Sequence, residues 1–122
     1  MSMKKPYLYM LDASGAPIPT DDVLAWGKWF EEHDDARSVA RTVVAEGVRV
    51  STCFLGIDHS VGFSDEAILW ETLIFGGVHN LAGERYASAE DARAGHDLWV
   101  LVARGELTPE TLRELRQITE TT

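Results

Sequence analysis

Two apolar stretches separated by a polar loop constrain the fold of this 122-residue chain more than any other feature. The first, Val48–Ile57, is rich in β-branched and aromatic residues, and the second, Ile68–Phe75, ends at a pair of glycines. Runs of this kind, bounded by glycine, predict β-strands. Only Glu71 and Thr72 interrupt the second run. A strand that is apolar on both sides predicts a central position in a sheet, covered on both faces or by a partner chain.

The rest of the chain supplies the other elements of a small α+β domain. The pattern predicts a first strand at Pro6–Leu11, turns over Asp12–Thr20, a helix capped by Thr20, a strand at Arg37–Ala45, a loop at Val78–Tyr86, a helix capped by Ser88 and ended by Gly105, and a last helix from Thr108 and Pro109. We therefore expect one domain covering residues 1–122. It should contain a mainly antiparallel sheet of about four strands, with two to three helices packed on it.

A two-residue turn at Glu46 and Gly47 predicts the register of one hairpin. An uninterrupted ladder from this turn would pair Val43 with Val50, Arg41 with Thr52, and Val39 with Phe54. These residues would form the core face of the hairpin. Arg41 is the one residue that does not suit such a face.

Two helices show apolar faces at helical spacing. In the first helix, the residues predicted to face the core are Val23, Trp26, Gly27 and Phe30. In the helix after Ser88, Gly95 costs about 1 kcal/mol relative to Ala, so it predicts a close approach of the helix to the sheet. His96 lies in the apolar stripe of the same helix and is expected to be a hydrogen-bonded core histidine.

Charge and cysteine content exclude several classes of protein. The net charge of −9 argues against general binding to the nucleic-acid backbone, which requires a basic face. It is compatible with a solvated surface, a basic partner, or mimicry of nucleic acid. A single cysteine excludes an internal disulfide and favours a reducing, cytoplasmic compartment. Neither a signal peptide nor a membrane span is predicted.

The loop between the two apolar stretches carries candidates for chemistry. Asp58 and His59 follow directly after a strand, and a carboxylate beside a histidine suits proton transfer or metal ligation. Asp65 and Glu66 add potential ligands in the same loop. The alternative is a loop whose polar side chains only cap backbone groups. Because the strong catalytic and metal-binding motifs are missing, no cofactor and no metal is assigned.

Glu71 is the sharpest anomaly, because an unpaired buried carboxylate costs several kcal/mol. It is a candidate general acid or base with a raised pKa, or half of an ion pair with Arg41 or Arg49. The predicted register places Arg41 and Glu71 on one face, bridged directly or through water. Cys53, which lies in the middle of a strand without a second thiol, is expected to be a small buried filler.

Three blocks of the sequence resemble a group of small acidic proteins encoded by bacteriophages, prophages and some bacteria. The blocks are VSTCFLGIDHS, ILWETLIFGG and ERYASAEDARAGH, which together span Val48 to His96. The resemblance implies a phage-borne accessory protein of unassigned activity, with no catalytic assignment to transfer. It marks as shared polar positions Asp58, His59, Glu71, Arg85, Tyr86, Gly95 and His96.

Three hypotheses about function follow. The first is a non-enzymatic binding protein that acts on a host or phage protein, or on a small molecule, in the service of counter-defence or regulation. Its candidate binding residues are Asp58, His59, Glu71, Arg85 and Tyr86. The second is a small hydrolase or nucleotide-processing enzyme that uses Asp58, His59 and Glu71. The third is a virion or assembly component, and a homodimer is compatible with each of the three.

Overall fold

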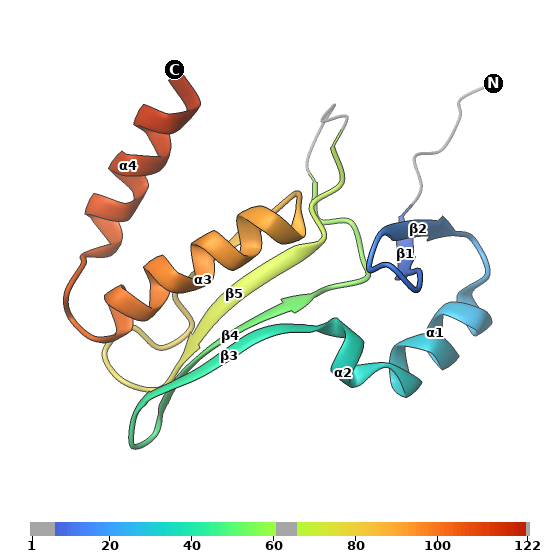
Figure 1. The fold of residues 1–122 in the computed structure, drawn as a ribbon, viewed down its shortest axis with the longest axis horizontal. Coiled ribbons are helices and arrows are strands. Elements are labelled where there is room, and N and C mark those ends of the chain that lie inside the picture. Colours follow the sequence, from blue (N-terminus) through green and yellow to red (C-terminus); the bar gives the residue numbers. More distant parts are fainter. Residues whose placement is uncertain (1–6, 61–65, 122) are drawn as a thin grey trace.

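The computed structural model describes residues 7–60 and 66–121, without the side chains of residues 119–121. Its elements in chain order are β1 (Leu8–Leu11), β2 (Pro17–Thr20), α1 (Val23–Glu32), α2 (Asp34–Arg37), β3 (Ser38–Ala45), β4 (Val48–Phe54), β5 (Trp70–Phe75), β6 (Gly83–Tyr86), α3 (Ala89–Ala103) and α4 (Pro109–Thr121) (Figure 1). The predicted start of the first strand, Pro6, lies outside the described residues.

A four-stranded antiparallel sheet with the order β3-β4-β5-β6 is the centre of the molecule. Helix α3 contacts all four strands and lies across one face of the sheet, whereas α1 and α2 lie beyond one end of β3 (Figure 1). The predicted α+β class is therefore confirmed. The central position of β5, between β4 and β6, is confirmed as well.

The core fills the space between the sheet and α3. One cluster of buried side chains comprises Val50, Ile74, Trp99, Val102 and Leu112, and the other comprises Phe54, Leu69, Trp70, Tyr86 and Ala92. Burial of each large apolar side chain stabilises the fold by about 1.5–3 kcal/mol. These two clusters fix α3 on one face of the sheet.

The fourth strand of the sheet is β6, which lies inside the predicted loop Val78–Tyr86. The predicted first strand instead pairs with β2 in a separate hairpin, and β2 occupies part of the stretch predicted to be turns. The indole of Trp26 joins this hairpin to the main sheet, because its Nε1 donates to the carbonyls of Tyr9 and Gly56, both at 3.1 Å. Strand β6, in contrast, has no apolar pattern in its sequence, and it is a strand because it pairs with β5.

Helix α1 begins two residues later than predicted. Asp22, rather than Thr20, is its N-cap and accepts a hydrogen bond from the amide of Ala25. Val23, predicted to face the core, is 64% exposed. The first turn of α1 therefore projects away from the sheet.

The hairpin of β3 and β4 departs from the predicted register. The ladder pairs Ala45 with Val48, Val43 with Arg49, Thr42 with Val50, Arg41 with Ser51, Ala40 with Thr52, and Ser38 with Cys53. Irregularities at Val44 and Val39 each add one residue to β3 relative to β4. Val44 and Val39 pack against the core, whereas Val43 is exposed. The bulge at Val44 moves Arg41 off the core face, where its charge would have been costly to bury.

The ends of the last two helices follow the predictions. The Ser88 hydroxyl accepts from the amide of Asp91, and Gly105 follows the end of α3 with φ of 79°. The Thr108 hydroxyl accepts from the amide of Thr111 at the start of α4. Arg116 then anchors α4 to β6, since its Nε and Nη2 donate to the carboxylate of Glu84 at 2.7 and 3.0 Å.

Candidate functional site

The face of the sheet opposite α3, here called the open face, is a candidate surface for binding. Alternation along the observed register assigns to it Ser38, Arg41, Val43, Arg49, Ser51, Cys53, Glu71, Leu73, Phe75, Gly83 and Arg85. Among the described residues no helix lies across it (Figure 1). Val43 is 74% exposed, and Leu73 and Phe75 are only partly buried. Apolar side chains therefore remain accessible in the middle of this sheet face.

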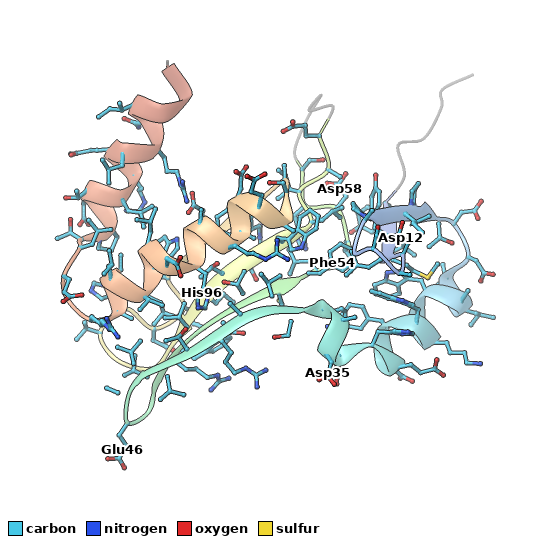
Figure 2. The ribbon with its side chains drawn as sticks, in the orientation of Figure 1. Asp12, Asp35, Glu46, Phe54, Asp58 and His96 are labelled. Carbon is cyan, nitrogen blue, oxygen red and sulfur yellow. The ribbon has the colours of Figure 1, made fainter. Side chains whose placement is uncertain are left out.

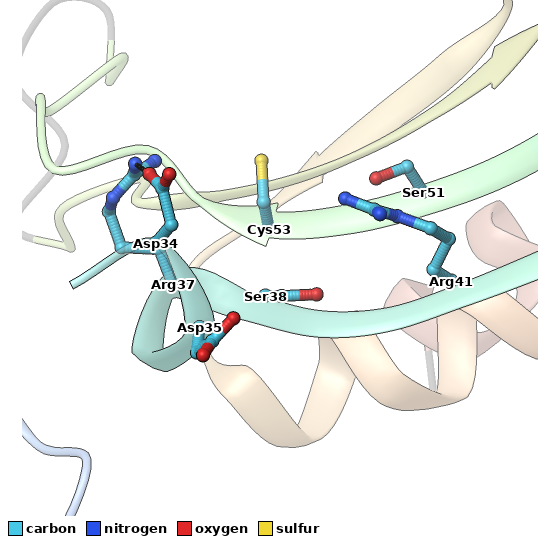
Figure 3. Close-up of a pocket in the computed structure, with 7 residues that line it drawn as sticks. All are labelled: Asp34, Asp35, Arg37, Ser38, Arg41, Ser51 and Cys53. Atoms are coloured by element: carbon cyan, nitrogen blue, oxygen red, sulfur yellow. Dashed lines mark hydrogen bonds and ion pairs between the residues drawn. The ribbon is translucent and has the colours of Figure 1, made fainter. Parts of the chain in front are cut away.

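A groove of about 600 Å³ lies where α2 meets the open face. Its lining residues are Asp34, Asp35, Arg37, Ser38, Arg41, Ser51 and Cys53 (Figure 3). The two acids come from α2, whereas Arg41, Ser51 and Cys53 come from β3 and β4. The groove therefore places carboxylates at one rim and a guanidinium on its sheet side.

The two arginines of the groove differ in their contacts. Arg37 pairs with Asp34, donates to the carbonyl of Phe30 at 3.2 Å, and lies 3.6 Å from the centroid of the Phe30 ring. Arg41 is exposed and makes no hydrogen bond or ion pair with any residue that the structure describes. Arg37 is therefore occupied inside the molecule, and Arg41 is available to a ligand.

Cys53 lies on the open face beside the groove and is partly buried. Burial raises the pKa of its thiol, the charge of Glu71 raises it further, and Arg37 opposes both effects. A raised pKa keeps the thiol protonated at neutral pH, and the neutral thiol is a weak nucleophile. The predicted filler role is compatible with this environment, although the residue faces the groove and not the core.

Glu71 forms its ion pair with Arg85 on the neighbouring strand, at 2.9 Å between carboxylate oxygen and Nε. The predicted partners Arg41 and Arg49 were therefore wrong. Arg49 instead lies over the ring of Phe75, 4.5 Å from its centroid. Glu71 and Arg41 do share one face of the sheet, as predicted, but it is the open face and not the core.

Asp58 has a structural role at the base of its loop. Its carboxylate accepts from the amides of Ser60 and Ile68 at 2.8 and 2.9 Å, and the residue is buried. The backbone of His59 donates to the carbonyl of Ile68. These bonds join the two ends of the loop. They agree with the second sequence-based interpretation, in which the polar side chains of the loop cap backbone groups. Asp65 lies outside the described residues.

The predicted catalytic trio does not form one cluster in the part of the chain that the structure describes. No hydrogen bond or ion pair among these residues joins any two of Asp58, His59 and Glu71. Within the same part of the chain, no group of three or more His, Cys, Asp and Glu side chains is placed to hold a metal ion.

A chain of buried polar side chains runs under α3, on the face opposite the groove. The Tyr86 hydroxyl donates to Thr72 at 3.0 Å, the Thr72 and Thr52 hydroxyls lie 2.5 Å apart, and Thr52 lies 2.7 Å from His96 Nδ1. His96 points from α3 to the sheet (Figure 2) and places its Nε2 2.9 Å from the Thr42 hydroxyl.

The chain of hydrogen bonds bears on the protonation of its members. Burial raises the pKa of the Tyr86 phenol well above its usual range, so that this hydroxyl is a donor. The remaining hydrogens are assigned so that every member is satisfied: each threonine donates to the next acceptor, Nδ1 of His96 accepts, and its Nε2–H donates to Thr42. Burial lowers the pKa of His96, against the opposing charge of Asp97, and favours this neutral form. We interpret the chain as structural, because every member is satisfied inside the protein.

Sequence reasoning missed Arg41 as a site residue. The one signal in the sequence was a charge in an otherwise apolar strand, which the uninterrupted register placed on the core face. Tyr86, predicted as a binding residue, is buried in the polar chain, whereas Arg85 reaches the open face. Of the five predicted binding residues, only Glu71 and Arg85 therefore belong to that face.

Comparison with known proteins adds no assignment. No protein-family model matches this sequence, and neither a curated protein nor a solved structure matches it. Within the described ranges, the helices are too short or too polar to cross a membrane.

Proposed function

We propose that this protein is a non-enzymatic binding protein of phage origin that attaches to a host or phage protein through the open face of its sheet. The observation that carries the proposal is that face itself, where Val43, Leu73 and Phe75 remain accessible between arginines. Accessible apolar side chains within a polar rim are typical of a protein-binding surface.

The environment of the candidate catalytic residues also favours binding over catalysis. Asp58 holds its loop together, Glu71 is paired with Arg85, and the Cys53 thiol stays protonated. The phage origin rests on the three sequence blocks between Val48 and His96. Interference with a host defence or regulatory protein is the role that this origin suggests.

A site-specific photo-crosslinker tests the proposal in bacterial cells. The crosslinking amino acid is placed at Val43 on the open face, or at Val78 as the control, which is 95% exposed but lies in a loop. We expect one dominant adduct from position 43 and none of that mass from position 78. Equal adducts from both positions would contradict an assignment to the open face.

The crosslinked protein is then identified by mass spectrometry, purified and titrated in a calorimeter. We expect Leu73→Ala and Phe75→Ala to weaken binding at least tenfold, since both remove accessible apolar surface from the open face. Leu101→Ala, on the exposed side of α3, is the matched control and should bind as the wild type does. Equal loss of affinity in all three variants would contradict an assignment to the open face.

A further inference from the structure

The charges of the open face differ in sign from those of the molecule as a whole. Three of its residues are arginines, at positions 41, 49 and 85, and Glu71 is its only acid among the described residues. Adding Asp34, Asp35 and Arg37 from the α2 side of the groove still gives four arginines against three carboxylates. The face and groove therefore carry a net charge of +1, and the rest of the chain carries −10, which together give the net charge of −9.

A local positive surface on an acidic protein selects an acidic partner. Opposite charges across an interface steer encounter and suppress wrong partners. A basic partner would be attracted to the other surfaces of the molecule and not to this face. A second copy of the same acidic chain would also be repelled over most of its own surface.

Contacts within the face single out Arg41 as the recognition residue. Arg85 is paired with Glu71, Arg49 lies over Phe75, and Arg37 is held by Asp34 and Phe30. Arg41 extends into the groove with no partner among the described residues (Figure 3). Its guanidinium offers the paired N–H donors that match a carboxylate.

The other lining groups fit a chain segment in this groove. The hydroxyls of Ser38 and Ser51 lie on the sheet side with Arg41, where they can donate to an acceptor (Figure 3). Asp35 lies on the α2 side and is an acceptor for backbone N–H groups. Leu73 is the cross-strand neighbour of Ser51, so an apolar surface continues from the groove along the sheet.

We propose that the open face docks an acidic segment of a partner protein, with a carboxylate side chain of that segment bound by Arg41 in the groove and its apolar side chains on Leu73 and Phe75. This inference rests on the proposed function and names the class of partner. It predicts that carboxylate and apolar side chains must be present together in one chain segment.

A fluorescent peptide of alternating Glu and Leu residues is the probe, and a Gln–Leu peptide of the same length is its control. Fluorescence anisotropy should show saturable binding of the Glu–Leu peptide to the wild-type protein, and binding of the Gln–Leu peptide at least tenfold weaker. Arg41→Gln should weaken binding of the Glu–Leu peptide about tenfold or more, because a hydrogen-bonded charge pair is lost. Arg41→Glu should weaken it further.

Arg93→Glu is the matched control, because it makes the same change of charge at an exposed position of α3. It should retain most of the binding. Equal losses in Arg41→Glu and Arg93→Glu would overturn the inference, as would absence of binding to the wild type or equal binding of the two peptides. Full displacement of the peptide by millimolar free glutarate would also overturn it, since the groove would then be a site for a small acid.

The crosslinking test separates this inference from the proposed function. A partner that attaches at position 43 but binds Arg41→Glu with unchanged affinity leaves the proposed function standing and refutes the acidic segment. Absence of a specific adduct at position 43 refutes the proposed function itself.

Discussion

The two faces of the sheet differ in what they do with polar side chains. On the face under α3, five polar side chains in a row satisfy one another, from Tyr86 through the threonines to His96 and Thr42. On the open face, Arg41 is next to Thr42 in the sequence but has no partner among the described residues. A buried polar group without a partner costs about 1–3 kcal/mol, whereas an exposed one is hydrated at no such cost.

This difference distinguishes a structural polar residue from a binding residue. On the covered face, the polar side chains are hydrogen-bonded to one another, and these bonds specify the position of α3 on the strands. A donor on the open face without an internal partner remains available for a ligand. We therefore expect substitutions on the covered face to act on stability, and those on the open face to act on binding.

The largest effect is expected from Gly95→Ala. The added Cβ would overlap the ring and hydroxyl of Tyr86, which is buried and cannot easily move. Overpacking at the upper end of the usual range costs about 3 kcal/mol. The gain in helix propensity returns about 1 kcal/mol, so urea denaturation should show a net loss of about 2 kcal/mol.

Gly27→Ala in α1 is the matched control, because a Cβ there meets no atom within 4 Å. It should stabilise the protein by about 0.5–1 kcal/mol through helix propensity alone. Similar effects of the two substitutions would mean that α3 does not approach Tyr86 as closely as described.

A smaller effect is expected from pH. Burial lowers the pKa of His96 in the folded protein below the ordinary value of 6.5, so the unfolded chain takes up a proton first as the pH falls. The stabilising contribution of neutral His96 to the free energy of unfolding is therefore fully present above about pH 6.5. It declines as the pH falls from 6.5 to the pKa of His96 in the folded protein.

Denaturation curves at a series of pH values measure this decline. In His96→Gln, the free energy of unfolding should no longer decline in the way that begins near pH 6.5. In His59→Ala, this decline should remain. A slope unchanged in His96→Gln would show that another group is responsible.

The ion pair on the open face should matter less for stability. Glu71 is 17% exposed and Arg85 is 51% exposed, so solvent screens their attraction. A double-mutant cycle with Glu71→Gln and Arg85→Gln should give a coupling below about 1 kcal/mol. A value of about 3–5 kcal/mol would indicate that a partner chain buries this pair.

The smallest expected effect is that of metal removal. Calorimetric melting with and without EDTA should give the same Tm, because no ligand set of structural spacing is visible in the sequence. A drop of several degrees would restore the metal hypothesis for Asp58, His59 and Asp65.

Local signals predicted those elements that depend on local chemistry. Ser88 and Gly105 bound α3, and Thr108 with Pro109 begins α4, because caps and glycine act within one turn of the helix. The close approach at Gly95 was also visible, since nothing else explains a glycine in the middle of this helix.

Features that depend on the neighbouring strand were missed. Strand β6 has only four residues, two of them charged, and exists through its pairing with β5. The positions of the bulges depend on which valines of β3 pack against the core. Counting residues from the turn cannot show which valines these are. One unseen bulge near the turn was enough to place Arg41 on the wrong face, and the missed strand β6 hid Arg85, which is the partner of Glu71.

The bulge at Val44 also bears on how such a chain tolerates changes of length in evolution. If Val44 were deleted, Val43 and Ala45 would become neighbours and would pair with Arg49 and Val48 in a regular ladder. The deletion would cost one apolar contact with the core. Loss of Thr42 would instead shift Arg41 to the position opposite Val50, which is fully buried. Two deletions only two positions apart are therefore expected to have opposite fates under selection.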